Sequence, residues 1–402
     1  MAAPPPAGPW PGLPADFKFG VDLIEFSKCH IAFLRTVHAA GLTQARPSAA
    51  SFRRYSELWL PLVASHQAAG LALVPPADVA WLWHCHRLAP YRYASHCQRE
   101  FSRTIEANPP FALQHWDGGG KDLIEPGPDD TGAATRALWA AAYPSEPFFL
   151  RLTEPAVEKG CSSPGVLAGF DLLGSSERQA TFLWQVQCPA SPERGRLASC
   201  EQCCAAQVSG HRFEDEEFLA EAVANYKRFV FLKKGASREQ VIVPTYQIDL
   251  MWHTHILASF AGYDADCIEL TGSTLNHDDS LNDRSEDSAL DVGFKLTKAL
   301  WKQTYDEDYV VDGGMYRGEP PAAYFEASWG AAGLAPAGQN LHLVGRCSPP
   351  SISLSLNRPS HWSGVAVSLH CSTAGDLCWC CAPATAGSGP HRPQHHKPGW
   401  WS

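Results

Sequence analysis

Two histidine pairs have the residue types and spacing to do chemistry. They occur in a Trp-His-x-His motif that appears twice, at residues 83–86 and 252–255. Histidine is the commonest metal ligand in proteins and titrates near neutral pH, so the pairs predict either a metal site or acid–base chemistry. The imidazoles concerned belong to His84, His86, His253 and His255.

Helical geometry limits what one pair can do alone. Residues two positions apart on an α-helix point about 200° away from each other, so His84 and His86 cannot hold one ion from a regular helix. One histidine from each motif could instead meet at a pseudo-twofold axis. Asp249 lies one turn before His253 and is expected to orient it, whereas Ala80 takes the matching place in the first motif. We therefore expect such a site to be asymmetric.

Further donors follow the second motif in a polar His-Asp-Asp run. His277 joins the candidate ligands of zinc or another divalent metal, with Asp278 and Asp279 as additional donors. Nucleophilic catalysis is poorly supported, because Cys85 between the first two histidines is replaced by Thr254 in the second motif. The sequence also lacks phosphate-loop and dinucleotide-binding fingerprints.

A structural interpretation of the motifs is the main alternative. Trp83 and Trp252 are then buried anchors of the core, and the imidazoles beside them satisfy carbonyl groups or helix ends. His30, which lies among apolar residues of an earlier helical pattern, is expected to be a hydrogen-bonded core residue in the same way. Both interpretations place the motifs on helices.

The motifs belong to a longer internal repeat. With Pro75 set against Pro244 the two copies align without a gap, and an apolar helical run precedes each proline. Downstream, both copies carry a Leu-Trp pair with a tyrosine four residues after the tryptophan. We predict two quasi-equivalent helical units, at about residues 50–150 and 212–320.

Local patterns predict a mainly α-helical fold. Apolar residues at helical spacing indicate a helix over residues 51–70, with Ser51 as N-cap and a kink at Pro61. A further helix over residues 171–187 is expected to bridge the two copies. Acidic residues at the start and lysines at the end predict another helix over residues 214–234, because these charges complement the helix dipole.

Composition limits the class of protein. With 45% hydrophobic residues and a formal net charge of −10, the chain is expected to be globular and not to bind a nucleic-acid backbone. No apolar run reaches the ~18–20 residues that span a bilayer, so no membrane span is expected. The N-terminus has no features of a signal peptide. The 14 cysteines are therefore predicted to be reduced thiols in a cytoplasmic protein.

The two ends are expected to lack a packed core. Residues 1–16 form a proline-rich lead, and residues 331–402 form a low-complexity tail of Ala, Gly, Pro and Ser with scattered Cys and His. Such segments cannot bury enough apolar surface to offset the entropy of ordering, so we predict disorder in both. The Cys-x-x-Cys group at Cys200 is half of a zinc knuckle and does not by itself predict a metal site.

Ordered short motifs along residues 17–320 resemble the GRDP-like family, the glycine-rich domain-containing proteins best known from plants. The motifs that carry the resemblance are VDLIEFSKCHIAFLRTVHAA, PADVAWLWHCHRLAPYRY, FDLLGSSERQATFLWQV, FLAEAVANYKRFVFL, PTYQIDLMWHTHILAS, LNHDDSLNDRS, LDVGFKLTKALW and GGMYRG. The resemblance implies a helical family domain over these residues. It also implies a regulatory protein linked to development, hormone response and tolerance of osmotic stress, with no established catalytic activity.

Two functions are consistent with these observations. The first is a non-enzymatic regulatory protein that acts through protein partners and needs no cofactor. It is favoured because helical spacing splits each histidine pair and no nucleophile is repeated. The second is a metal-dependent enzyme, or a metal- or small-ligand-binding protein, that uses the paired histidines.

Overall fold

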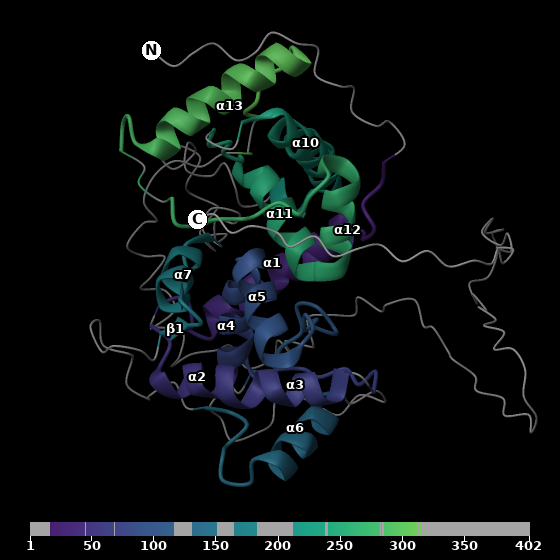
Figure 1. Ribbon diagram of the computed structural model, residues 1–402, viewed down its shortest axis with the longest axis vertical. Helices are drawn as coiled ribbons and strands as arrows, with labels where there is room; N and C mark the ends of the chain where they lie inside the picture. Colours follow the sequence, from purple (N-terminus) through teal and green to yellow (C-terminus); the bar gives the residue numbers. More distant parts are fainter. Residues whose placement is uncertain are drawn as a thin grey trace, which may run out of the picture. The chain divides into compact units, whose positions relative to one another are not determined.

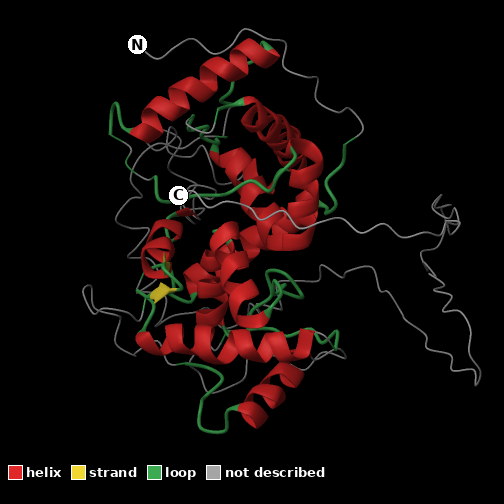
Figure 2. Ribbon diagram, viewed as in Figure 1, coloured by secondary structure: helices red, strands yellow, loops and turns green. Residues whose placement is uncertain are grey.

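The computed structural model describes residues 17–115 except 45 and 68, residues 131–150, 165–182 and 212–311 except 238, 239, 282 and 284, and residue 314. All of them fall in Met1–Cys347, the first of the two units into which the chain divides. Regular structure in the described residues is almost entirely helical (Figures 1 and 2), which confirms the predicted fold class. Their only sheet is an antiparallel ribbon of β1 (Val166–Leu167) and β2 (Phe170–Asp171).

The first half of the described chain contains the helices that position the first motif. They are α1 (Leu23–Ala39), α2 (Ala49–Arg53), the π-helical turn η1 (Arg54–Trp59), α3 (Leu60–Gln67), α4 (Ala77–Arg87), α5 (Pro90–Phe101), α6 (Thr131–Ala142) and α7 (Leu172–Gln179). The first motif lies on α4. Asp22 caps α1, because its carboxylate accepts the backbone N–H groups of Ile24 and Glu25.

The second half contains the helices that position the second motif, which lies on α11. They are the 3-10 turn η2 (Arg212–Glu214), α10 (Glu216–Gly235), α11 (Tyr246–Ala258), α12 (Phe260–Thr271) and α13 (Ala289–Tyr305). The side chains of Asp215 and Thr245 cap α10 and α11. Acidic residues occupy the first turn of α10 and lysines its last turn, as the charge pattern predicts.

The helical region around Pro61 begins earlier than predicted. Ser48 rather than Ser51 is the N-cap, since Oγ of Ser48 accepts the backbone N–H of Ser51 at 3.1 Å. The stretch before Pro61, where the sequence predicts a kink, is the π-helical turn η1. Proline has no N–H, and its ring crowds the carbonyl four residues earlier, so a wider turn just before it relieves the clash.

Other expectations are corrected or lie outside the described residues. Of the helix expected over residues 171–187, α7 covers Leu172–Gln179, a turn follows at residues 180 and 181, and residues 183–187 lie outside the described part of the chain. It packs against α4. The proline-rich lead at residues 1–16, the cysteine-rich group at Cys200 and the tail at residues 331–402 are outside the described part of the chain.

The cysteines do not all follow the prediction of reduced thiols. Cys29 is disulfide-bonded, so the prediction is wrong there. The free cysteines among the described residues are Cys85, Cys97 and Cys267, all buried. Within the described part of the chain, no helix has both the length and the apolar character to cross a membrane.

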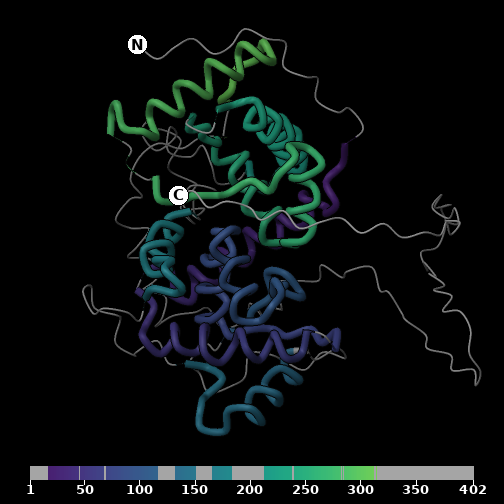
Figure 3. Tube along the Cα trace, viewed as in Figure 1, coloured from purple at the N-terminus to yellow at the C-terminus, as the bar shows by residue number. Residues whose placement is uncertain are grey.

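Helices α4 and α11 lie in the interior. Every residue of α4 is buried, and so is every residue of α11 except Asp249. Helix α11 packs on α1, α10 and α12 and also contacts α4, so segments far apart in the sequence meet at the two motif helices (Figure 3). A helix that is buried on all sides must satisfy its polar side chains inside the protein.

Each motif tryptophan is held by the same relay of hydrogen bonds. The indole N–H donates to a tyrosine hydroxyl of the following helix, and that hydroxyl donates to a backbone carbonyl. The relays are Trp83–Tyr93–Ile105, with distances of 2.8 and 2.7 Å, and Trp252–Tyr263–Leu275, with distances of 2.9 and 2.7 Å. Both tryptophans are buried, which confirms the predicted core positions.

The last histidine of each motif also makes a matching contact. Nδ1 of His86 is hydrogen bonded to Oη of Tyr55 at 2.8 Å, and Nδ1 of His255 to Oη of Tyr226 at 3.1 Å. The residues just before the aligned prolines match as well. The backbone N–H of Val74 donates to the hydroxyl of Thr135 on α6, and that of Val243 donates to the hydroxyl of Thr297 on α13. These contacts support the internal duplication, which stays a prediction.

Removing a motif tryptophan is expected to destabilise the fold strongly. Trp83→Ala and Trp252→Ala each leave a cavity and a tyrosine hydroxyl without its donor, so each should lower the free energy of unfolding by about 3–5 kcal/mol. Urea unfolding followed by far-UV circular dichroism measures the loss. Tyr93→Phe and Tyr263→Phe are the matched controls that remove only the relay, at about 1–3 kcal/mol each. A Trp252→Ala protein as stable as wild type would show that this core assignment is wrong.

Candidate metal centre

Asp249, His253 and His277 bring three ligand atoms together beside the second motif. Asp249 and His253 lie one turn apart on α11, and His277 enters from the segment after α12. Nε2 of His253 lies 2.9 Å from Nε2 of His277 and 3.4 Å from Oδ1 of Asp249, and Nε2 of His277 lies 3.9 Å from the same oxygen. Within the described residues, this is the one cluster of at least three such ligands.

The spacing of these atoms suits a small divalent cation. A circle through the three atoms has a radius of about 2.0 Å, and zinc binds imidazole nitrogen and carboxylate oxygen at about 2.0–2.2 Å. Two histidines and one carboxylate are a donor set that zinc uses in proteins. Because zinc prefers about four ligands, one position remains for water or another donor.

The orientation of the His277 ring also suits a metal ligand. Its Nδ1 donates a hydrogen bond to the carbonyl oxygen of Leu88 at 2.7 Å. In the neutral ring, Nε2 then carries a lone pair, and this lone pair is directed at Nε2 of His253. A hydrogen bond from the other ring nitrogen to a carbonyl is the usual way in which a protein orients a metal-binding histidine.

Burial keeps both histidines in the neutral form. His253 and His277 are 1% and 8% exposed, and the rings of Phe182 and Trp252 pack against them. Burial lowers the pKa of His253 well below its usual value, with a smaller effect from neighbouring histidines. Burial also lowers the pKa of His277, although Asp279 and the carbonyl that it contacts oppose the shift. Neutral imidazole is the form that binds metal, so no net release of a proton from the histidines is required near pH 7.

His86 and His255, both predicted as ligands, lie away from this cluster. His86 is hydrogen bonded to Tyr55, and His255 to Tyr226. This agrees with the expectation that helical spacing turns the two histidines of one motif away from each other. Nε2 of His255 donates to Oδ2 of Asp266 at 3.1 Å, and the ring of His86 stacks on Phe170. Their contacts in the structure are those of core residues.

His84 lies near the second motif but contributes no atom to the cluster. Its ring stacks on Phe33 at 5.0 Å and lies 5.2 Å from the ring of His30. His30 is hydrogen bonded to Thr254 at 3.0 Å, which confirms it as a hydrogen-bonded core residue. The ring of His30 lies 6.4 Å from that of His253, so the two motifs approach each other through this third histidine.

The aspartates take different roles from those expected. Asp249, predicted only to orient His253, places its own oxygen among the ligand atoms, and the one-turn spacing was the signal for this contact. Asp278 accepts the backbone N–H of Ser280. Asp279 is held by α7, where its carboxylate accepts from Ser175, Arg178 and Gln179.

The buried histidines predict a loss of stability in mild acid. Burial lowers the pKa of His86 from 6.5 to about 3, so between these values the unfolded state binds a proton that the folded state does not. The free energy of unfolding should therefore fall as the pH drops below 6.5, by about 1.4 kcal/mol per pH unit for this residue.

Urea unfolding of wild type and His86→Asn between pH 7.5 and pH 5 measures this contribution. Asparagine keeps an acceptor close to the position of Nδ1 but does not titrate. The free energy of unfolding of the variant should therefore depend on pH less steeply than that of wild type, by about 1.4 kcal/mol per pH unit. Equal slopes for the two proteins would mean that His86 is protonated or exposed in the folded state.

Comparison with known proteins finds a matching family. The sequence model of a family described as "Glycine-rich domain-containing protein-like" matches residues 125–261, which include α10 and α11. No solved structure matches the chain.

Two similar proteins from Arabidopsis thaliana carry the same family name. Glycine-rich domain-containing protein 1 is 33% identical over 315 residues, which cover 76% of this chain and 34% of the relative. Glycine-rich domain-containing protein 2 is 34% identical over 314 residues, covering 75% of this chain and 35% of the relative. The chain thus spans about a third of the length of these relatives. The chain is thus similar to glycine-rich domain-containing proteins over about three quarters of its own length, and the family model matches its residues 125–261.

Proposed function

We propose that the protein is a non-enzymatic regulatory protein whose helical domain binds one divalent metal ion, zinc in the first instance. The observation that carries this proposal is the triangle of ligand atoms from Asp249, His253 and His277, whose size suits a zinc ion. The orientation of His277 by the Leu88 carbonyl and the burial of both imidazoles support it.

A structural role for the metal is favoured over a catalytic one. The rings of Phe182 and Trp252 pack against the two histidines, and of the three ligands Asp249 has the most exposed side chain, at 18%. The free thiols of the described residues are buried, and burial raises the pKa of each, so they are poor nucleophiles. A metal-dependent enzyme remains the alternative, with no specific observation in its favour.

A metal at this site would join two parts of the chain that are distant in sequence. Asp249 and His253 belong to α11, whereas His277 bonds Leu88, which caps the end of α4. The ion would fix the His277 ring between them and so stabilise the contact between the two motif helices. Binding of a ligand to the folded state alone stabilises that state, by about 2.7 kcal/mol at a hundredfold excess over the dissociation constant.

We place the regulatory role of the chain in development, hormone response and osmotic stress, acting through protein partners. This part of the proposal is supported by the resemblance to the plant proteins and by the family match. The absence of a repeated nucleophile and the interior position of the motif histidines favour binding over catalysis.

The purified protein is expected to bind one equivalent of zinc and to melt at a higher temperature with it. Elemental analysis after dialysis gives the stoichiometry, and thermal unfolding with zinc or with EDTA gives the stabilisation. His253→Asn should lose the metal and the zinc-dependent shift, because asparagine offers no imidazole nitrogen to the site.

His255→Asn is the matched control for this experiment. His255 lies two residues away on the same helix and is equally buried, at 1% exposed, but its Nε2 contacts Asp266 instead of the cluster. A folded His255→Asn protein should keep the metal. Zinc retained at one equivalent by a folded His253→Asn protein, or a wild type that is metal-free and unshifted by zinc, would contradict the proposal.

A further inference from the structure

Helix α7 holds the segment that carries His277. The carboxylate of Asp279, two residues after His277, accepts three hydrogen bonds from this helix. Its Oδ1 accepts from Arg178 at 2.8 Å, and its Oδ2 accepts from Ser175 at 3.0 Å and from Gln179 at 3.2 Å. The Arg178 and Asp279 side chains are 21% and 17% exposed, so water weakens their ion pair less than it weakens a surface pair. We call this group of hydrogen bonds the Asp279–α7 contact.

His277 is therefore connected to α4 in two ways. The direct connection is the hydrogen bond from its Nδ1 to the carbonyl oxygen of Leu88, at the end of α4. The indirect one is the Asp279–α7 contact, because α7 packs on α4. The first orients the imidazole ring, and the second fixes the backbone from which that ring extends. Together they hold Nε2 of His277 beside His253 before any ion is bound.

Asp279 takes part in this arrangement without being a metal ligand. Both of its oxygens accept hydrogen bonds from α7, and the ligand cluster consists of Asp249, His253 and His277. Residues that hold a ligand in place without touching the metal typically change metal affinity by about ten- to a hundredfold when they are replaced.

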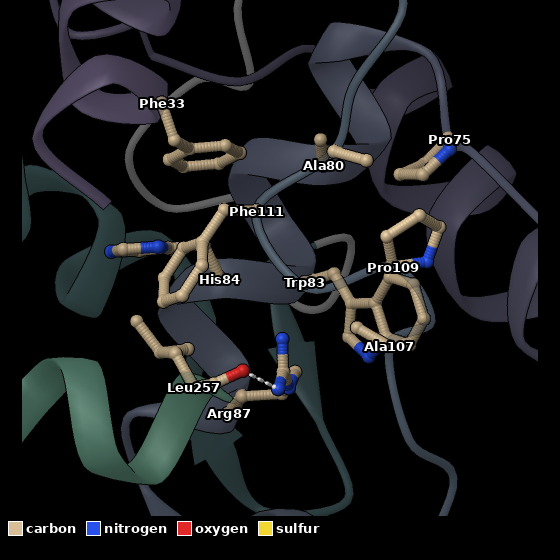
Figure 4. A pocket seen from close by; sticks show the side chains of 11 residues that line it. Phe33, Pro75, Ala80, Trp83, His84, Arg87, Ala107, Pro109, Phe111 and Leu257 are labelled. Atoms are coloured by element: carbon tan, nitrogen blue, oxygen red, sulfur yellow. Dashed lines mark hydrogen bonds between the residues drawn. The ribbon is translucent and has the colours of Figure 1, made fainter. Parts of the chain in front are cut away.

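The first half of the chain lacks these ligands and also lacks a carboxylate like that of Asp279. Its residues at the matching positions are Ala80 for Asp249, Ala107 for His277 and Pro109 for Asp279. The first pair lies four residues before the motif histidine, and the other pairs lie two and four residues after the relay carbonyls of Ile105 and Leu275. Figure 4 shows the three first-half residues around the space beside His84, where the described lining contains no carboxylate and no second imidazole. The half that has the metal ligands is thus also the half that has Asp279.

We propose that α7 sets the metal affinity of the centre through the Asp279–α7 contact, with Asp279 and Arg178 as positioning residues. This inference rests on the metal centre proposed above. A site whose ligands are already in place binds more tightly, because the ion does not have to order them. Without the contact, the ion would have to order the segment around His277 on binding, and this cost would lower the affinity.

The coupling acts in both directions. A contact that raises the affinity for zinc by some factor is itself stabilised by zinc by the same factor. Metal binding is therefore expected to stabilise α7, which gives the protein a helix outside the ligand cluster whose stability depends on the metal. Local stability of this kind is measured by the exchange of backbone amide hydrogens.

The zinc affinity of the full chain, measured by competition with a chromophoric chelator, tests the proposal. Asp279→Asn removes the charge of the acceptor, and Arg178→Met removes its charged donor. Each should weaken zinc binding by about ten- to a hundredfold, while one equivalent still binds at saturation because no ligand is lost. Arg178→Lys keeps a charged donor and should restore part of the affinity. If one of the first two variants does not fold, the other carries the test.

Glu177→Gln is the matched control on the same helix. The carboxylate of Glu177 pairs with Arg46 at 2.6 Å and is not part of the Asp279–α7 contact, so this variant should bind zinc as wild type does. Hydrogen exchange followed by mass spectrometry should show that zinc slows the exchange of α7 amides in wild type, and does so less in Asp279→Asn.

The outcomes separate this inference from the metal centre itself. A wild type that binds zinc, with folded Asp279→Asn and Arg178→Met proteins that bind it equally tightly, would overturn the role of α7 and leave the metal centre standing. An equal loss of affinity in Glu177→Gln would overturn the assignment to Asp279, because any weakening of α7 would then have the same effect. A wild type that binds no zinc would contradict the metal centre and this inference with it.

Discussion

The burial of two polar helices is the constraint on which the rest of this structure depends. Helices α4 and α11 carry histidine, tryptophan and charged residues, yet almost every position on them is inside the protein. Buried polar groups are costly unless they are hydrogen bonded. The tyrosine relays to Trp83 and Trp252 and the tyrosine contacts of His86 and His255 meet this requirement, and they do so in the same way on both helices.

This satisfaction is incomplete at several buried side-chain atoms, and two examples lie on the motif helices. Nδ1 of His253 and Nε of Arg87 are buried without a partner among the described residues. The first atom belongs to the imidazole ring whose other nitrogen, Nε2, faces His277 and Asp249. The second belongs to the guanidinium group at the end of α4. Local polar arrangements that a fold does not satisfy are typical of functional sites, because proteins depart from the general rules mainly there.

The sequence was informative where local spacing decides the outcome. The repeated motif predicted the buried tryptophans, helical geometry predicted the separation of His84 from His86, and the one-turn spacing predicted the contact of Asp249 with His253. It named His277 among the candidate ligands but could not predict that His277, and not His84, His86 or His255, meets His253. His277 reaches the cluster only because the chain turns after α12 and because Leu88, far away in sequence, orients its ring. Such tertiary contacts leave no periodic pattern in the sequence.

The most direct test of the metal centre is X-ray absorption spectroscopy of the zinc-loaded protein, because it reports the ligand atoms themselves. The geometry predicts a shell of nitrogen and oxygen at about 2.0–2.2 Å, with the outer-ring scattering of two imidazoles from His253 and His277. The same measurement on His277→Gln should show one imidazole fewer. A shell containing sulfur at about 2.3 Å, or an unchanged number of imidazoles in that variant, would show that the ion is held elsewhere.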